Sequence, residues 1–83
     1  MNVVQLGKII TGHRKASGQT QAELARLAGV GKTVVFDIEH GKDSLRFDKL
    51  LKILSALNIE LELSSPILSE VLTEIKQTKA KQK

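Results

Sequence analysis

A glycine-containing break at residues 29–31 separates two short helical patterns, and it limits the possible folds more than any other feature of this chain. Before the break, Thr20 and Glu23 are spaced as in a capping box, where each side chain accepts a hydrogen bond from the other residue's backbone N–H. This pattern predicts a helix over residues 21–28. After the break, apolar residues at helical spacing predict a second helix over residues 32–40. Because glycine permits a positive φ, we expect a tight turn between the two helices.

Two longer helices are predicted on either side of this pair. The first covers residues 3–16 and ends before Gly18, a residue type that favours helix termination. The second covers about residues 47–57. The apolar faces of the two helices are Leu6, Ile9, Ile10 and His13 on the first, and Phe47, Leu50, Leu51, Ile53, Leu54 and Leu57 on the second. Because His13 lies on an apolar face, we expect it to be a core histidine with no catalytic role.

The hydrophobic period changes from helical to alternating at residues 59–64. Alternation of this kind predicts a β-strand, and a strand needs a partner for its backbone N–H and C=O groups. No second strand is predicted in the chain, so we expect two copies to pair through Ile59, Leu61 and Leu63 in a twofold-symmetric dimer. The alternative is an extended segment that packs on its own domain.

A fifth helix is predicted with Pro66 in its first turn and Ser65 as its cap. Its apolar residues form one stripe, which consists of Ile67, Leu68, Val71, Leu72 and Ile75. The lysine-rich end that follows is expected to be loose and solvated, with an electrostatic role as the alternative. We therefore divide the chain into a first domain at 1–57, a dimerisation strand and helix at 58–77, and a basic tail at 78–83.

Charge is distributed unevenly along these parts. Residues 1–56 carry nine Lys and Arg against five Asp and Glu, whereas residues 57–75 carry four Glu and no basic residue. Residues 76–83 carry four Lys and no acid. A basic first domain suggests a polyanionic partner, although a net charge of +4 is a weak signal by itself.

The helix, tight turn and second helix at residues 20–40 form a helix-turn-helix arrangement. A helix of this length fits the major groove of duplex DNA, where its first turn reaches the base edges. The preceding helix crosses the DNA backbone, and the N–H groups at its start face a phosphate. The sequence therefore predicts a module that binds duplex DNA.

Three segments carry a family resemblance: Gln19-Thr20-Gln21-Ala22-Glu23-Leu24-Ala25, then Gly29-Val30, then Ile38-Glu39-His40-Gly41-Lys42. They are similar to the Xre/Cro-type helix-turn-helix of phage repressors, and the likeness covers residues 6–57. The continuation through residues 47–54 into a strand resembles the HipB-like antitoxins. This resemblance implies a mainly α, five-helix, repressor-like domain with one short C-terminal dimerisation strand. It also implies a palindromic operator, a homodimer and a HipA-type kinase toxin as partner.

The resemblance also assigns roles to individual residues. It implies that Gln21 holds a phosphate and braces the recognition helix, and that Lys32 and Thr33 point at base edges. Lys42 and Arg46 are expected to meet flanking phosphates. The full set of implied DNA-binding residues is Gln21, Lys32, Thr33, Val34, Phe36, Asp37, Lys42 and Arg46. Arg14 and Glu39 match a structural ion pair of the family. The alternative is that the two side chains are separate and solvated.

Two positions depart from the family pattern. Asp37 stands where a basic or amide residue is usual, so it either accepts from a cytosine amine or is held by Lys32 or another basic residue. Phe36 replaces a small polar residue, and it either contacts thymine methyl groups or faces protein. The sequence leaves both choices open. His40 is expected to be an exposed surface residue, with a phosphate contact as the alternative.

Other functional classes are disfavoured by composition. The chain has no cysteine and two histidines, which argues against a disulfide framework and a structural zinc site. No paired base, nucleophile or metal ligand accompanies its acids, so we expect no catalytic residue, no metal and no cofactor. No apolar run is long enough to span a membrane, and no signal peptide is evident, which predicts a cytoplasmic, nucleoid-associated protein. The alternatives to an antitoxin are a stand-alone regulator and a protein-binding adaptor.

Overall fold

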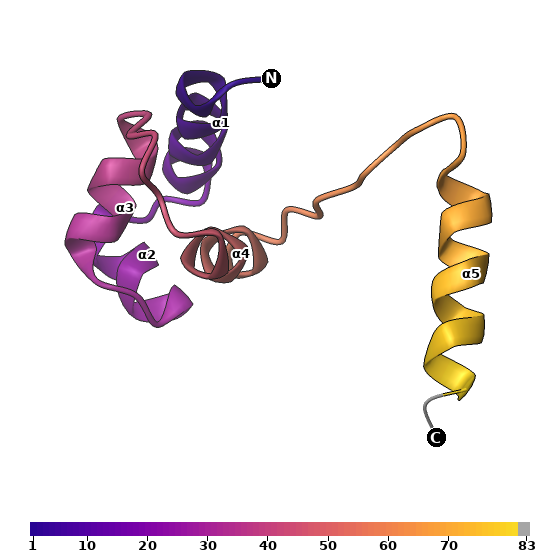
Figure 1. The fold of residues 1–83 in the computed structure, drawn as a ribbon. Coiled ribbons are helices and arrows are strands. Elements are labelled where there is room, and N and C mark those ends of the chain that lie inside the picture. Colours follow the sequence, from indigo (N-terminus) through magenta and orange to yellow (C-terminus); the bar gives the residue numbers. More distant parts are fainter. Residues whose placement is uncertain (82–83) are drawn as a thin grey trace.

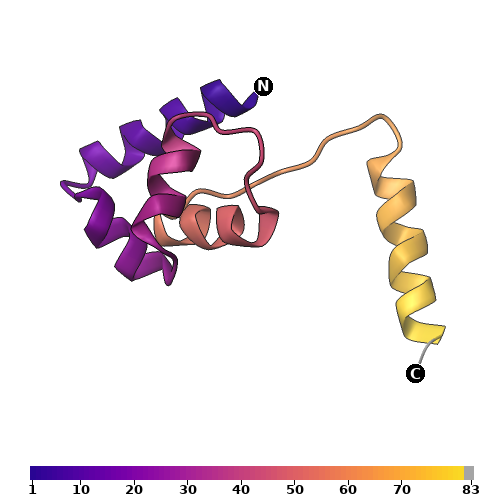
Figure 2. The same cartoon turned by 60° about the vertical axis from the view of Figure 1, so that its left-hand side comes forward.

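The computed structural model describes the backbone of residues 1–81 and the side chains of residues 1–77 (Figure 1). It confirms the predicted mainly helical fold. The helices are α1 (Val3–Ala16), α2 (Gln21–Ala28), α3 (Lys32–Glu39), α4 (Phe47–Ala56) and α5 (Leu68–Lys81). The first four form one body, from which an extended segment leads to α5, and Figures 1 and 2 both show α5 apart from that body.

Helix α3 lies at the centre of the body and packs against α1, α2 and α4, while α2 also packs against α4. Their facing sides enclose one apolar core, consisting of Ile10, Leu24, Ala25, Val35, Ile38, Leu50, Ile53, Leu54 and Leu57. Burial of these side chains stabilises the four helices together, because helices this short are marginal alone. The core therefore fixes α3 from its inner side and leaves its outer side free.

Each of the first four helices is followed by a residue in the left-handed region, namely Gly18, Gly29, Gly41 or Asn58. After each one, the chain donates a backbone hydrogen bond back into the helix. After α2, for example, the Val30 N–H donates to the Ala25 carbonyl at 3.0 Å. This geometry satisfies carbonyls at the helix end, and glycine adopts it without the penalty of a Cβ. The sequence therefore marks these helix ends locally.

The buried face of α1 differs from the predicted one. Ile10 is fully buried as expected, but Ile9 is 36% exposed and His13 is exposed. The expectation of a core histidine was wrong, since the His13 Nδ1 lies 2.7 Å from the Ile9 carbonyl on the surface of the helix. The face turned inward carries Gly7, Ile10 and Arg14, because α1 approaches α3 closely at Gly7 and reaches it through Arg14.

The segment between α4 and α5 contains no β-strand in the single chain described. Ile59 packs partly against the core of its own domain, and its N–H donates to the Leu54 carbonyl at 2.9 Å. The left-handed conformation of Asn58 directs it there, so Ile59 follows the alternative of intramolecular packing. Leu61 and Leu63 are 50% and 78% exposed. Pairing of this segment with a second copy remains a prediction.

Helix α5 begins at Leu68, two residues after Pro66, and the Leu68 N–H donates to the Ser65 carbonyl at 3.3 Å. The helix continues to Lys81, so the backbone of residues 78–81 is helical where a loose tail was predicted. Good helix formers without glycine or proline account for this continuation. Residues 82–83 of the predicted tail lie outside the described part of the chain.

Candidate nucleic-acid interface

The outer side of α3 presents a connected set of polar and aromatic side chains. Lys32, Thr33 and Phe36 are exposed, and Asp37 is half-buried beside them. Val35 and Ile38 point into the core, as the helical period predicts. Val34 is partly buried and packs against the core. It therefore does not share the exposed position of Lys32, Thr33 and Phe36. The structure therefore brings four of the predicted residues together on one free helix face.

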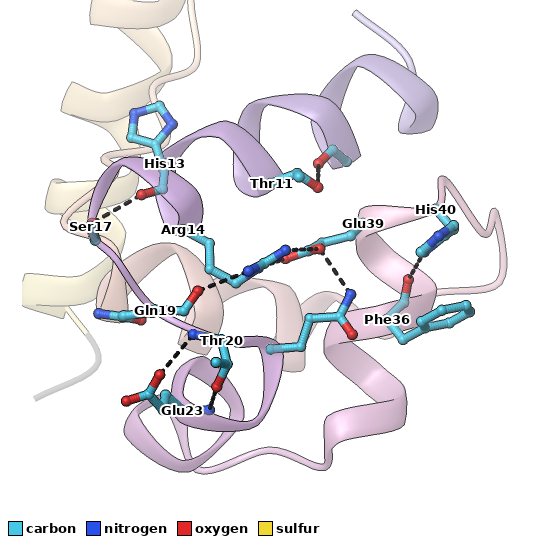
Figure 3. A network of polar contacts seen from close by, with 12 residues as sticks. Thr11, His13, Arg14, Ser17, Gln19, Thr20, Glu23, Phe36, Glu39 and His40 are labelled. Atoms are coloured by element: carbon cyan, nitrogen blue, oxygen red, sulfur yellow. Dashed lines mark hydrogen bonds and ion pairs between the residues drawn. The ribbon is translucent and has the colours of Figure 1, made fainter.

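A largely buried ion pair holds the C-terminal end of α3 against α1 (Figure 3). Arg14 Nε donates to Glu39 Oε2 at 2.6 Å, and Arg14 Nη2 donates to Glu39 Oε1 at 3.1 Å. The two side chains are only 11% and 3% exposed. A two-point contact between a guanidinium and a carboxylate fixes orientation as well as distance. The predicted pair is thus a rigid connection between α1 and α3.

Two further groups complete this network. Gln21, the first residue of α2, donates from Nε2 to Glu39 Oε1 at 3.0 Å. Arg14 Nη1 donates to the backbone carbonyl of Gln19 at 2.8 Å, which ties the α1–α2 connection to the same guanidinium. Glu39 therefore joins three helices, and Gln21 occupies the bracing position that the resemblance implies.

Ionisation of Glu39 is favoured within this network. Burial opposes the charged form, but the hydrogen bonds from Arg14 and Gln21 outweigh burial, and the pKa of Glu39 lies below its ordinary value. The hydrogen bond to Glu39 likewise raises the pKa of Arg14, despite the opposing effect of burial. Both side chains therefore stay charged at neutral pH, and the connection between α1 and α3 persists as an ion pair.

Phe36 and His40 form a stacked pair on the exposed side of α3. Their ring centroids are 3.9 Å apart, and the rings are inclined by 24° (Figure 3). Phe36 is 48% exposed, so it does not enter the protein core. His40 is exposed, as its sequence position predicted. Phe36, which stands where the family has a small polar residue, thus places an apolar ring on the free face of the helix.

The loop after α3 carries the two basic residues predicted to meet phosphates. Lys42 Nζ lies 3.3 Å from Asp37 Oδ2, with both side chains partly exposed. Asp37 is therefore held by a basic residue, which is one of the two alternatives that the sequence left open, although the partner is Lys42 instead of Lys32. Arg46 makes a two-point contact with Asp48 at 2.9 and 3.1 Å. Both loop cations remain accessible to solvent.

Two structural contributors to this interface were not identified from the sequence. The Gln19 carbonyl holds Arg14, and a backbone acceptor leaves no signal in residue identity. Gly7 lets α1 approach α3, because a Cβ placed there would meet the Ile38 and Glu39 carbonyl oxygens at 2.5 and 2.6 Å. A glycine inside a helical pattern does carry a signal, since it is unfavourable there unless close packing requires it.

Two further kinds of feature, metal-ion clusters and membrane spans, were sought in residues 1–81. In that range, no cluster of three His, Asp or Glu side chains is placed to hold a metal ion. None of the helices described is both long enough and apolar enough to cross a membrane.

Comparison with known proteins identifies the family. A helix-turn-helix family model matches residues 12–63. The chain is 33% identical over 61 residues to an uncharacterized HTH-type transcriptional regulator, y4mF, of Sinorhizobium fredii, covering 74% of this chain and 80% of the relative.

Solved structures agree with this match. HipB in a HipA–HipB–O2–O3 complex superposes with a TM-score of 0.72 at 26% identity, covering 80% of this chain and 93% of that one. The restriction-modification controller protein C.AhdI of Aeromonas hydrophila superposes with a TM-score of 0.64 at 33% identity, over 70% of this chain and 88% of that one. This protein belongs to the Xre-type helix-turn-helix family of DNA-binding transcriptional regulators.

Proposed function

We propose that this protein is a sequence-specific transcriptional repressor that inserts α3 into the major groove of its operator. The observation that carries the proposal is the arrangement of α3 itself. Its inner side is fixed by the core and by the Arg14–Glu39 pair, while Lys32, Thr33 and Phe36 project from its free side. A helix held rigidly from behind presents base-reading side chains in one orientation, which is what direct readout requires.

Base contacts are assigned to the first turn of α3. The Lys32 ammonium donates to guanine O6 and N7, and the Thr33 hydroxyl and methyl reach a neighbouring base. Asp37 remains a candidate acceptor for a cytosine amine, because Lys42 occupies one of its carboxylate oxygens, Oδ2. Val34 belongs to the same turn, but its packing against the core suggests a supporting role.

Phosphate contacts are assigned to Gln21, Lys42 and Arg46. An amide nitrogen carries two N–H groups, so Gln21 can donate one to Glu39 and the other to a phosphate. Lys42 and Arg46 exchange their exposed acidic partners for phosphates at little cost, because surface ion pairs contribute little stability. Since phosphate contacts release counterions, we expect affinity to fall steeply with salt.

Binding to a palindromic operator requires two copies of α3 about one helical turn of DNA apart. We propose that Leu61 and Leu63 of two copies meet in an antiparallel pair, because both are exposed and follow an extended backbone. Ile59 is partly engaged with its own domain, so it anchors the segment instead of forming the centre of the interface. The proposed homodimer is isologous.

We further propose that the protein represses its own promoter as the antitoxin of a HipA-type kinase. Support comes from the likeness to HipB in its complex with HipA, and from likeness to HipB in a complex with an O4 20mer. The exposed apolar side chains Val71, Leu72 and Ile75 on α5, together with Ile67 just before it, offer a surface for such a partner. A regulator of this kind works on the chromosome, so we place it in the cytoplasm with the nucleoid.

The likeness to C.AhdI favours a second candidate, a stand-alone regulator without a toxin. Electrophoretic mobility shift on the DNA upstream of the protein's own gene, with excess nonspecific competitor, tests repression in either form. A discrete complex that survives competitor is expected. If folded protein forms no such complex, the protein is not a repressor of this promoter, and the remaining candidate is an adaptor that binds other proteins. Co-purification with a kinase encoded beside the gene distinguishes the antitoxin from the stand-alone regulator.

Lys32→Ala is expected to relax the preference for one base pair per half-site by about 1–3 kcal/mol, because the ammonium contact to the base is lost. Binding to a panel of operators with single base-pair changes measures this preference. The matched control is Lys52→Ala. Lys52 is an exposed lysine on α4 that makes none of the proposed contacts. Equal loss on all sequences would show that Lys32 contacts phosphate only.

Leu61→Pro is expected to weaken the dimer about thirtyfold, because each of the two paired strands loses a backbone hydrogen bond of about 1 kcal/mol. Sedimentation velocity over a concentration series measures the dissociation constant. Leu61→Thr keeps the N–H group and the strand propensity, and should retain most of the dimer. A proline variant that sediments as the wild-type dimer would place the interface elsewhere.

A further inference from the structure

The stacked pair of Phe36 and His40 is the most unusual feature of the outer α3 face. The chain has only two phenylalanines and no tyrosine or tryptophan, yet one phenylalanine stands half-exposed on the helix proposed to enter DNA. Its ring stacks on His40 with centroids 3.9 Å apart (Figure 3). The exposed part of the Phe36 ring is apolar surface, and covering it with another apolar group is favourable.

The pair is held in one orientation. His40 Nδ1 lies 2.7 Å from the Phe36 carbonyl oxygen. A carbonyl oxygen only accepts, so Nδ1 carries the proton and donates it. This hydrogen bond fixes the imidazole of His40, the residue that follows α3, and the imidazole in turn covers one face of the Phe36 ring. The other parts of the ring remain available, and little rotational freedom is left to lose when they are covered.

The chemistry of the major groove selects the partner. Its floor presents hydrogen-bond donors and acceptors from every base, together with one apolar group, the C5-methyl of thymine. A phenyl ring pressed on donors or acceptors would leave them without partners, which is unfavourable. A ring placed on the methyl group buries apolar surface on both sides.

We propose that Phe36, supported by His40, reads the C5-methyl group of a thymine in each operator half-site. This inference rests on the proposed function, because it requires α3 to enter the major groove. Phe36 lies one turn after Lys32, on the same exposed side of the helix. Asp37 follows Phe36 by one residue on a helix of 3.6 residues per turn, so its side chain leaves α3 about 100° away from that of Phe36. Phe36 acts as the specificity residue and His40 as its positioning residue.

Deoxyuracil provides a direct test, because it differs from thymine only by the missing C5-methyl group. The probe is a duplex selected from a random pool by the wild-type protein, made once with thymine and once with deoxyuracil. Wild-type protein is expected to bind the deoxyuracil duplex about fourfold more weakly for each methyl group it buries. This first comparison uses no variant, so it does not depend on how any substitution folds.

Three variants then locate the effect. Phe36→Ala is expected to bind the thymine duplex more weakly and to lose most of the thymine-to-deoxyuracil ratio. His40→Ala should reduce the ratio partly, because the ring loses its support. Phe47→Ala removes the other exposed phenylalanine, which lies on α4, and should keep the wild-type ratio. Circular dichroism checks that each variant retains its helices.

The outcomes separate the inference from the function on which it rests. Equal wild-type affinity for the two duplexes, or an unchanged ratio in Phe36→Ala, overturns the methyl-reading role while DNA binding stands. Unchanged DNA affinity in Phe36→Ala, with loss of a protein partner, would assign the stacked pair to protein contact. Failure of the wild-type protein to select any duplex overturns the proposed function, and the inference with it.

Discussion

Glu39→Gln is expected to lower the free energy of unfolding by about 3 kcal/mol, because it leaves the largely buried Arg14 guanidinium without its counter-charge. Arg14 and Glu39 are 11% and 3% exposed, so water replaces the lost partner poorly. A domain of this size has a total stability of only about 5–10 kcal/mol. The variant should therefore melt well below the wild type in thermal or urea denaturation.

Asp48→Asn is the matched control for this effect. It removes the acid of another two-point Arg–carboxylate pair, but Arg46 and Asp48 are 69% and 56% exposed. Exposed pairs contribute about 0–1 kcal/mol, so stability should barely change. Similar losses in Glu39→Gln and Asp48→Asn would contradict the structural importance assigned to burial of the Arg14–Glu39 pair.

The Arg14–Glu39 pair should also make the stability of the wild-type protein depend on pH in acid. The pKa of Glu39 is lower in the folded state than its ordinary value of 4.5. Its contribution to stability is thus fully present above that value, and it is lost as pH falls toward the lower, folded-state pKa. Glu39→Gln has no such group to protonate, so its stability should depend less on pH below about 5. Parallel acid-denaturation curves would contradict this assignment.

Gly7→Ala is expected to destabilise the protein by about 2 kcal/mol, although alanine favours helix formation. The added Cβ would lie 2.5 Å from the Ile38 carbonyl oxygen and 2.6 Å from that of Glu39. Both atoms belong to the backbone of α3, so α1 must move away from the recognition helix. That movement would also separate Arg14 from Glu39, and DNA affinity should fall with stability.

Gly12→Ala on the same helix should have the opposite effect. A Cβ at Gly12 meets no atom within 4 Å, so the substitution gains only helix propensity, about 1 kcal/mol. Urea denaturation of both variants measures the difference, and their opposite signs are the critical result. Stabilisation by Gly7→Ala would show that α1 and α3 can move apart without cost.

Much of the helical layout is determined by the sequence itself. The predicted bounds of α1 and α2 agree with the structure, and those of α3 and α4 differ by about one residue at their C-terminal ends. The reason is that capping boxes and left-handed glycines act over three to five residues, so a short stretch of sequence is enough to predict a helix end. The turn at residues 29–31 follows the same local rules. Because this turn is part of the family pattern, the family could also be assigned from the sequence.

Only the tertiary structure decides how these helices meet. The approach of α1 to α3 at Gly7 and the exposed position of His13 depend on packing between elements far apart in the chain. So does the choice of Lys42 as the partner of Asp37, because it depends on the path of the loop after α3. Residue patterns specify which side of a helix is apolar, but close packing specifies which part of that side another helix touches.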